Sequence, residues 1–249
     1  MINDECGDAF FQGTKYTREE LPRKSLNVNE KPDDFKIYEN RERVALPTEH
    51  DFLLNDLKHV LVERRSRRRF SPEPMALQEL STLLKFSAGL SNEEGAEFSD
   101  SGFKLRHVPS AGGLYPYETY VIAHNVEGLN RGLYHYHVPG HALDVLKEGD
   151  FRKDAAGICL DQFLARDCAA MLAWTLVAPR SKWKYGERAY RYIFLDLGHL
   201  AQNFYLVAEV LQLSACAIGA LYDDEGNDFL EVDGYDESLC YVGVVGRRA

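Results

Sequence analysis

Apolar residues recur at the spacing of one helix face in three stretches of the chain. The stretches cover 53–61, 77–84 and 195–213. Two prolines precede the second stretch and Gly89 follows it, as residues that begin and end helices do. The third stretch is apolar over much of its surface, which predicts a central helix that is buried or packs against a second chain.

Further stretches show the alternation or the short apolar runs of strands. They are 117–124, a hairpin over 131–145 that turns at Pro139-Gly140, the buried run 168–177, and 241–245. Polar residues predict loops over 91–107 and 179–190. Helices and strands mix without regular alternation, so the pattern predicts an α+β fold and not a doubly wound α/β fold.

The first 50 residues have a different character from the rest. They are polar, carry three prolines and many charges, and show little periodicity. We expect residues 1–50 to form an arm that packs over a surface rather than an independent domain. Residues 51–249 then form one domain, because a chain of 249 residues fits one domain with an arm.

Charge and cysteine content narrow the classes of function. A formal net charge of −10 makes general binding to nucleic acid or to an anionic membrane a poor fit. The five cysteines are an odd number without CxxC spacing, and Cys159, Cys168 and Cys216 lie in apolar runs, which favours a reducing compartment. The start of the chain has no signal-peptide character, and the longest apolar run, 168–179, is too short to span a bilayer. These features predict a cytoplasmic protein.

A basic run, Arg64-Arg65-Ser66-Arg67-Arg68-Arg69, follows the first predicted helix. A phosphate monoester carries about two negative charges at neutral pH. Guanidinium groups bind it in bidentate pairs, and a serine hydroxyl adds a donor. The run is therefore a candidate phosphate site. The alternative is a solvated basic helix end, which the helix dipole favours in any case.

Two other segments carry candidate chemistry. The turn Pro109-Ser110-Ala111-Gly112-Gly113 has adjacent glycines that let backbone groups approach a planar ligand, although an ordinary turn before a strand shows the same pattern. In Lys184-Tyr185-Gly186 a lysine directly precedes a tyrosine, and an ammonium and a phenol that lie close together can share a proton. A plain surface loop is the alternative for this second segment.

Three histidines, His135, His137 and His141, are weaker candidates for a metal site. The first two would point to one face of a strand, but Pro139-Gly140 turns the chain before the third, and no carboxylate stands at ligand spacing. We therefore expect no metal. The chain also lacks the GxGxxG, GxxxxGK[ST] and GxSxG patterns of dinucleotide-binding folds, P-loops and nucleophile elbows.

In their order along the chain, these segments resemble the nitroreductase superfamily. Within it they resemble the SagB-type dehydrogenases, which include the azoline oxidases of thiazole- and oxazole-containing peptide pathways. The resemblance covers nearly the whole chain and rests on Thr14-Lys15-Tyr16, Pro32-x-x-Phe35-Lys36-x-Tyr38, Leu46-Pro47, Arg64-Arg65-Ser66-x-Arg68-x-Phe70, 109–118, Gly132-Leu133-Tyr134-x-Tyr136, His141-x-Leu143, 184–192, Gly198-His199-x-Ala201-Gln202-Asn203 and Ala217-Ile218-Gly219. It implies the FMN-dependent nitroreductase fold, in which helices flank a central mixed or antiparallel sheet. It also implies an intertwined homodimer with the flavin at the interface, where the arm packs on the core or on the partner.

The resemblance also implies roles for individual residues. Lys184 and Tyr185 match the catalytic pair of the azoline oxidases. The positions that match flavin contacts are Arg64, Arg65, Ser66 and Arg68 for the phosphate and ribityl chain, Pro109, Ser110, Ala111, Gly112 and Gly113 along the ring, Gln162 as a further contact, and Ile218 and Gly219 near N5. Many nitroreductases reach the phosphate with a basic residue on a long C-terminal arm. This chain ends at Arg247-Arg248-Ala249, and Arg247 is the candidate for that role.

Three hypotheses about function remain at this stage. The leading one is an FMN-dependent dehydrogenase that oxidises a C–N or C–C bond of an azoline-like, modified-peptide or small-molecule substrate, with hydride transfer to flavin N5. The first alternative is an NAD(P)H-dependent reductase of nitroaromatics or quinones, in which Lys184 and Tyr185 have no catalytic part. The second alternative is a non-enzymatic flavin-binding or scaffold subunit.

Overall fold

The computed structural model of the protein describes residues 9–10, 27–48, 57–91 and 105–249. Some of the predicted features lie outside these residues. They are the first half of the helix expected over 53–61, most of the loop expected over 91–107, and the segment Thr14-Lys15-Tyr16 of the arm.

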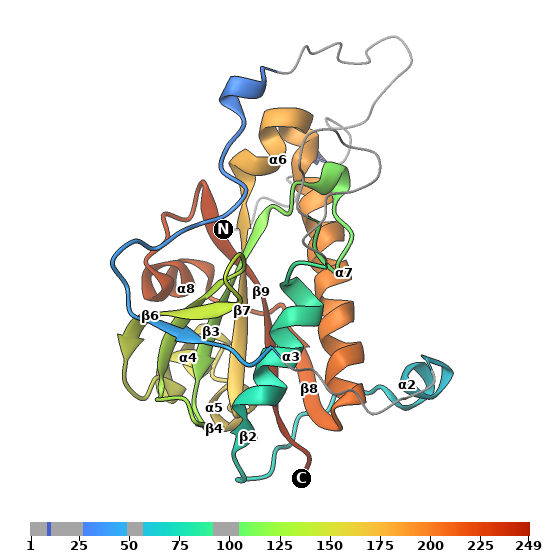
Figure 1. Cartoon of the computed structure of the whole chain (residues 1–249), viewed down its shortest axis with the longest axis vertical. Coiled ribbons are helices and arrows are strands. Elements are labelled where there is room, and N and C mark those ends of the chain that lie inside the picture. The colour runs from blue at the N-terminus through green and yellow to red at the C-terminus, as the bar shows by residue number, and fades with distance from the viewer. Residues whose placement is uncertain (1–8, 11–26, 49–56, 92–104) are drawn as a thin grey trace.

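The centre of the molecule is a seven-stranded sheet in which every neighbouring pair is antiparallel (Figure 1). In spatial order its strands are β1 (Arg43–Ala45), β6 (Ala142–Glu148), β5 (Gly132–His137), β3 (Tyr117–Ala123), β7 (Ala170–Val177), β9 (Glu237–Arg247) and β8 (Leu213–Ile218). A separate parallel pair joins β2 (Met75–Ala76) to β4 (Val126–Glu127). The antiparallel sheet combined with separate helices confirms the predicted α+β fold.

Helices cover both faces of this sheet. One face carries α3 (Leu77–Ala88) and α7 (Ala189–Val210), and the other carries α4 (Arg152–Ile158), α5 (Phe163–Asp167) and α8 (Asp223–Leu230). The central strand β7 supplies both cores because its side chains alternate: Leu172 and Trp174 face α7, whereas Met171 and Ala173 face α4 and α5. The remaining helical segments are α2 (Leu57–Glu63), α6 (Ala178–Tyr185), η1 (Val28–Glu30), η2 (Ala111–Gly113) and η3 (Gly186–Arg188).

A glycine in β9 lets α7 approach the sheet. A Cβ atom at Gly243 would stand 2.6 Å from the Trp174 ring and 2.9 Å from the Phe204 ring of α7. These two rings meet edge to face with their centroids 5.4 Å apart. The position of α7, from which much of the site described below is built, thus depends on a small residue beneath it.

Two predictions about secondary structure are wrong. Residues 179–190, expected to be a loop, form α6, η3 and the start of α7. The pattern concealed α6 because the side chains that α6 buries include the polar Arg180 and Ser181 rather than an apolar stripe. The long helix begins at Ala189 rather than 195 and ends at Val210, and the residues that follow form the unpredicted strand β8.

The described part of the arm packs on the core. Its strand β1 lies at the edge of the sheet beside β6. Farther back along the arm, the Lys36 backbone N–H donates to Glu118, and the Lys36 ammonium donates to the Tyr120 hydroxyl at 2.8 Å and to Glu237 at 2.5 Å. These contacts attach the arm to β3 and β9.

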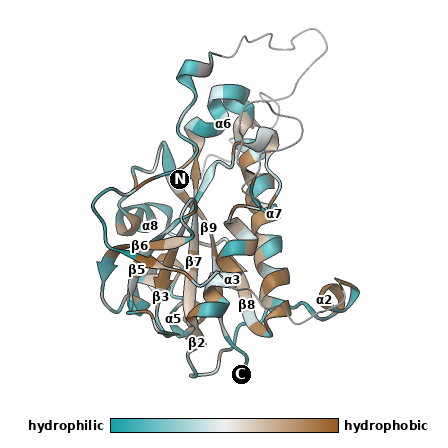
Figure 2. Ribbon diagram, viewed as in Figure 1, coloured by the Kyte–Doolittle hydropathy of each residue, from teal (hydrophilic) through white to brown (hydrophobic). Residues whose placement is uncertain are grey.

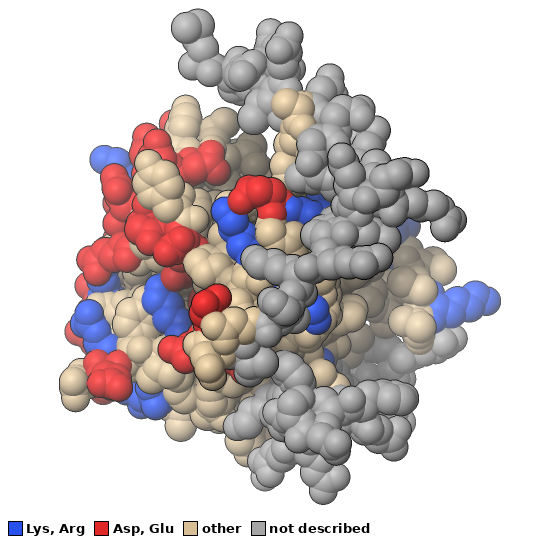
Figure 3. Space-filling view, turned by 90° about the horizontal axis from the view of Figure 1, so that it is seen from above, with Lys and Arg blue, Asp and Glu red and all other residues tan. Residues whose placement is uncertain are grey.

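Acidic side chains gather on the side of the molecule where α8 and β6 lie, on the left of Figure 3. They include Asp223, Asp224 and Glu225 in the first turn of α8, where the helix dipole favours negative charge. Among the described residues no helix combines the length and the apolar character that crossing a membrane needs. Nor do three histidine, cysteine or carboxylate side chains of these residues gather as metal ligands.

His135 lies between two buried carboxylates. Its Nε2 is 3.0 Å from Glu118, and its Nδ1 is 3.8 Å from Asp144, which also pairs with Arg43. Burial by itself lowers the pKa of His135, but the adjacent carboxylates of Asp144 and Glu118 outweigh this effect, so the pKa is raised. The protonated imidazole therefore helps to hold β5, β3 and β6 together.

We predict that this stabilisation is lost as the pH rises. The unfolded pKa of histidine is about 6.5. Because the folded pKa of His135 lies above it, the contribution is complete below about pH 6.5 and disappears as the pH passes through the folded pKa. The difference in free energy of unfolding between the wild type and His135→Gln, measured by urea titration from pH 5 to pH 9, should shrink with rising pH. His137→Gln is the control with the opposite sign, because burial lowers the pKa of His137. A difference for His135→Gln that grows with pH would contradict the prediction.

Candidate functional site

The glycine turn before β3 is attached to α7 by one carboxylate. The Ser110 hydroxyl donates to Asp196 at 2.5 Å, and the Ala111 N–H donates to the same carboxylate at 3.2 Å. Gly112 and Gly113 follow with φ values of 67° and 65°, a region that glycine occupies without strain. The turn therefore has a defined position on the helix.

Lys184 and Tyr185 lie against this turn. A Cβ atom at Gly112 would stand 2.6 Å from the Tyr185 hydroxyl and 2.9 Å from the Lys184 ammonium. The ammonium is 5.4 Å from the centroid of the Tyr185 ring. The Tyr185 ring in turn packs edge to face on Tyr192 of α7 at 4.8 Å. Two segments that the sequence separates by about seventy residues thus form one cluster, which we call the Lys–Tyr cluster (Gly112, Lys184 and Tyr185).

Asp196 is a site residue that the sequence analysis missed. It is almost completely buried. Burial raises the pKa of its carboxyl, and the hydrogen bonds from Ser110 and Ala111 act in the opposite direction. An acidic residue inside an apolar helix is the signal that could have identified it, because buried carboxylates have specific partners.

The basic run is attached to β8 through Tyr205 of α7. The Arg64 guanidinium stacks 5.3 Å from the centroid of the Tyr205 ring, and the Ser66 hydroxyl is 3.1 Å from the Tyr205 hydroxyl. The same hydroxyl accepts a hydrogen bond from the Ala217 N–H at 2.7 Å. Ala217 precedes Ile218, so the basic run and the end of β8 lie together. We call Arg64, Ser66, Tyr205 and Ala217 the Arg–Ser cluster.

The structure separates the arginines of this run by their partners. Arg67 pairs with the buried Glu209, which also pairs with Arg248. Within the described part of the chain, no carboxylate pairs with the guanidinium groups of Arg64, Arg65, Arg68 and Arg69. Arg67 is thus structural, whereas Arg64, Arg65 and Arg68, the three arginines that the resemblance selects, keep uncompensated charges.

The other predicted flavin contacts fall in three places. Gln162 is the N-cap residue of α5. The carbonyl of Ile158, at the end of α4, accepts a hydrogen bond from the Tyr222 N–H. This bond brings the turn between α4 and α5 close to the loop that follows Ile218 and Gly219. The Gly219 backbone lies beside the Tyr241 ring, 3.7 Å from the position of an added Cβ. Arg247 is engaged elsewhere: it pairs with Glu79 at 2.6 Å and donates to the Pro74 carbonyl. Its suggested role at a phosphate stays a prediction.

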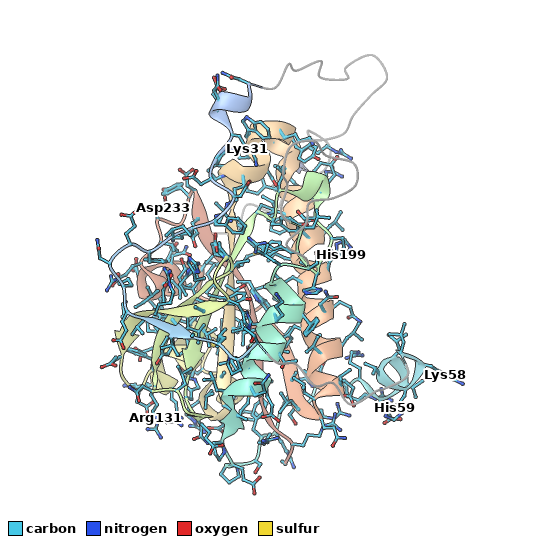
Figure 4. The ribbon with its side chains drawn as sticks, viewed as in Figure 1. Lys31, Lys58, His59, Arg131, His199 and Asp233 are labelled. Carbon is cyan, nitrogen blue, oxygen red and sulfur yellow. The ribbon has the colours of Figure 1, made fainter. Side chains whose placement is uncertain are left out.

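The two clusters flank one exposed strip of α7. Asp196 and Tyr205 are nine residues apart, which is about two and a half helical turns and roughly 14 Å along the axis, so they point to opposite sides of the helix. Leu195, Gly198 and His199 lie exposed on the strip between them, and Figure 4 labels His199 on α7.

The nitroreductase family model matches residues 61–247 of the chain. This chain belongs to the nitroreductase family. The match spans both clusters and every strand from β2 to β9.

Two relatives support the assignment. A protein of Methanocaldococcus jannaschii whose name assigns it to the nitroreductases is 32% identical over 200 residues, which cover 80% of this chain and 95% of the relative. The trifolitoxin-processing protein TfxB of Rhizobium leguminosarum bv. trifolii is 29% identical over 183 residues, 71% of this chain and 48% of the relative. The chain therefore spans about half the length of the trifolitoxin protein.

Solved structures share the fold of this nitroreductase-family protein. A nitroreductase from Anabaena variabilis superposes with a TM-score of 0.73 at 28% identity, covering 96% of this chain and 46% of that one. A nitroreductase from Desulfovibrio desulfuricans, solved in complex with FMN, superposes with a TM-score of 0.53 at 17% identity, covering 79% of this chain and 88% of that one. The predicted nitroreductase fold is confirmed.

We predict that Gly112→Ala, but not Gly113→Ala, displaces the Lys184 and Tyr185 side chains from the glycine turn. Both substitutions place a side chain at positive φ, which costs about 1–3 kcal/mol of folding free energy. Only the Gly112 Cβ meets Tyr185 and Lys184, whereas the Gly113 Cβ meets nothing within 4 Å. The chemical shift of a ¹³C label at Cζ of Tyr185 should therefore change in Gly112→Ala and stay at its wild-type value in Gly113→Ala. The two variants should lose similar amounts of folding free energy. Equal shifts in both variants would show that the contact is absent in solution.

Proposed function

We propose that this nitroreductase-family protein is an FMN-dependent dehydrogenase that removes hydrogen from a C–N or C–C bond next to an acidic proton. The observation that carries the proposal is the Lys–Tyr cluster. A Cβ atom at Gly112 would stand within 3 Å of both the Tyr185 hydroxyl and the Lys184 ammonium. A proton-transfer pair placed beside a glycine turn is an arrangement suited to a planar ligand.

The residues of the Arg–Ser cluster fit the phosphate of FMN. Arg64, Arg65 and Arg68 have no carboxylate partner among the described residues, and the Ser66 hydroxyl lies 3.1 Å from the Tyr205 hydroxyl, on whose ring the Arg64 guanidinium stacks. Uncompensated guanidinium groups are suited to bidentate phosphate binding. We propose that the turn and the end of β8 contact the flavin ring; those positions are Pro109, Ser110, Ala111, Gly112, Gly113, Gln162, Ile218 and Gly219, with Arg247 as a weaker candidate at the phosphate.

FMN supplies the redox chemistry by accepting a hydride equivalent at N5. The residues of the chain supply the acid–base chemistry and the positioning. Tyr185 would remove the acidic proton of the substrate, and the Lys184 ammonium, which lies 5.4 Å from the centroid of the Tyr185 ring, would stabilise the phenolate form that accepts this proton. Asp196 keeps the turn opposite this pair by binding Ser110 and Ala111. Such positioning of reacting groups is a large part of catalysis.

A modified peptide with an azoline-like ring is the substrate class that we propose. Support comes from the relative TfxB, whose name describes the processing of trifolitoxin. Because the chain spans only about half of that relative, the peptide substrate is carried over as a proposal only. An NAD(P)H-dependent reductase of nitroaromatics or quinones is the second candidate, because the archaeal relative that the chain covers almost completely is named as a nitroreductase.

Lys184→Ala and Tyr185→Phe test the proposed chemistry. Both variants should keep FMN, because the Arg–Ser cluster is unchanged, and each should oxidise an azoline peptide about 10²–10⁴-fold more slowly, the usual loss of a general acid or base. Lys182→Ala and Tyr190→Phe, from the same segment, are the matched controls and should stay near the wild-type rate. If Lys184→Ala and Tyr185→Phe also match the wild type, the acid–base assignment is wrong.

Stopped-flow reduction of the bound flavin separates the two candidate functions. Rapid bleaching by NADPH, with no dependence on Lys184 or Tyr185, would support the reductase. A purified protein that is colourless and cannot be reconstituted with FMN would exclude both.

We propose further that two copies of the chain form the working unit. Helices α2 and α7 both carry exposed apolar side chains. Helix α2 lies apart from the core in Figure 2. The exposed apolar side chains are Leu57, Leu61 and Val62 on α2, and Phe194 and Leu195 on α7. The strip of α7 between the two clusters carries part of this surface, so a second copy there could contribute to each flavin site.

Leu195→Glu should break this dimer. The substituted carboxylate would lie in an apolar interface at a position that is 60% exposed in the single chain. The solution mass should fall from twice 28.3 kDa to 28.3 kDa, and FMN affinity should fall with it. Tyr235→Glu, at an 86% exposed position near the acidic side, is the control and should keep the wild-type mass. A wild-type protein of 28.3 kDa that binds FMN would contradict the dimer proposal.

A further inference from the structure

Arg180 joins the segments that form the Lys–Tyr cluster. From α6, its guanidinium donates to Glu118 of β3 at 2.5 Å and to the Asp33 carbonyl of the arm at 3.0 Å. Its remaining nitrogen lies 3.4 Å from the carbonyls of Tyr115 and Tyr117, which follow the glycine turn. One side chain therefore contacts the arm, the turn and the sheet.

The ion pair at the centre of this arrangement is buried. The side chains of Arg180 and Glu118 are 5% and 2% exposed. Burial would raise the pKa of Glu118, but Arg180 and the neighbouring His135 hold that pKa well below its usual range, so the carboxylate is charged. A buried ion pair is weak evidence for stability, since apolar replacements of similar volume are often as stable. Its value here lies in the geometry that it imposes.

That geometry reaches Lys184 through a short helix. Arg180 stands four residues before Lys184, so one turn of α6 separates the guanidinium from the ammonium. Gly186, with a φ of 56°, follows directly after α6, so the helix ends at the cluster. A small tilt of α6 about Arg180 would move the Lys184 and Tyr185 side chains away from Gly112.

The arm also contacts α6 at a second point. The Trp183 indole N–H donates to the Asn27 carbonyl at 3.0 Å. Farther along the arm, Lys36 contacts Glu118, the partner of Arg180, through its backbone N–H. The arm thus contacts α6 and also binds the carboxylate of Glu118, which is the partner of Arg180.

We infer that Arg180 is a positioning residue that makes the N-terminal arm a working part of the active site. By binding Asp33 and Glu118 together, it couples the seating of the arm to the placement of Lys184 and Tyr185 over the glycine turn. This inference rests on the proposed function for its kinetic consequence, but the coupling itself is a structural claim about the arm and α6.

Arg180→Met and Arg180→Lys test the coupling in the full-length, FMN-loaded protein. In Arg180→Met, amide hydrogen exchange should increase at least tenfold over residues 27–38 and over α6, with the exchange of β7 and β9 unchanged. The kcat for the azoline peptide should fall at least tenfold with KM within threefold, because the substrate still binds but the acid–base pair is displaced. Arg180→Lys, which keeps the positive charge, should recover part of the protection from exchange and part of the kcat. Arg152→Met is the matched control, because Arg152 also forms an ion pair and a carbonyl contact, at α4 on the other face of the sheet.

Lys36→Met loosens the arm without touching α6 and guards against misfolding of the Arg180 variants. It should increase amide hydrogen exchange over the arm and lower kcat, as Arg180→Met does. The inference is overturned if Arg180→Met changes kcat no more than Arg152→Met does, or if Lys36→Met frees the arm and leaves kcat unchanged. If the wild type oxidises no azoline, the proposed substrate fails, and the exchange measurements alone decide the coupling: unchanged exchange over α6 in Arg180→Met would overturn it.

Discussion

The contact between Asp196 and the glycine turn determines where the candidate site can form. A buried carboxylate must be matched by donors, and Ser110 and Ala111 supply them. The turn is therefore attached to α7, and Gly112 meets the ends of Lys184 and Tyr185. Without this carboxylate the Ser110 hydroxyl and the Ala111 N–H would lose their shared acceptor, and the turn would have no fixed position opposite α6.

Ion pairing decides which charges remain available for a ligand. The chain as a whole is acidic, yet it gathers cations next to β8. Glu209 pairs with both Arg67 and Arg248 and so attaches the run to α7 and to the C-terminal strand. The neighbouring Arg64 stacks on the Tyr205 ring instead and has no carboxylate partner among the residues that the structure describes. A single buried carboxylate thus separates structural arginines from arginines suited to a phosphate.

The sequence predicts elements well where the buried face is apolar and poorly where it is polar. The period of α3 and the alternation of β3 identify these elements because leucine recurs at the buried positions 80, 83 and 84, and tyrosine, valine and isoleucine fill most of the buried positions of β3. The helix α6 escapes the same analysis because it buries Arg180 and Ser181. Local periodicity likewise places Tyr205 in an apolar helix and does not reveal that its hydroxyl joins Ser66 to Ala217.

The sequence by itself determined the α+β class, the family and the chemical types at the site, because these follow from local periodicity and from short segments in a fixed order. Only the tertiary structure decided which side chains meet. Ser110 and Asp196 are 86 positions apart, and Ser66 and Tyr205 are 139 apart. Such contacts leave no mark on local periodicity, because they depend on how α7 packs on the sheet and not on the residues beside each partner.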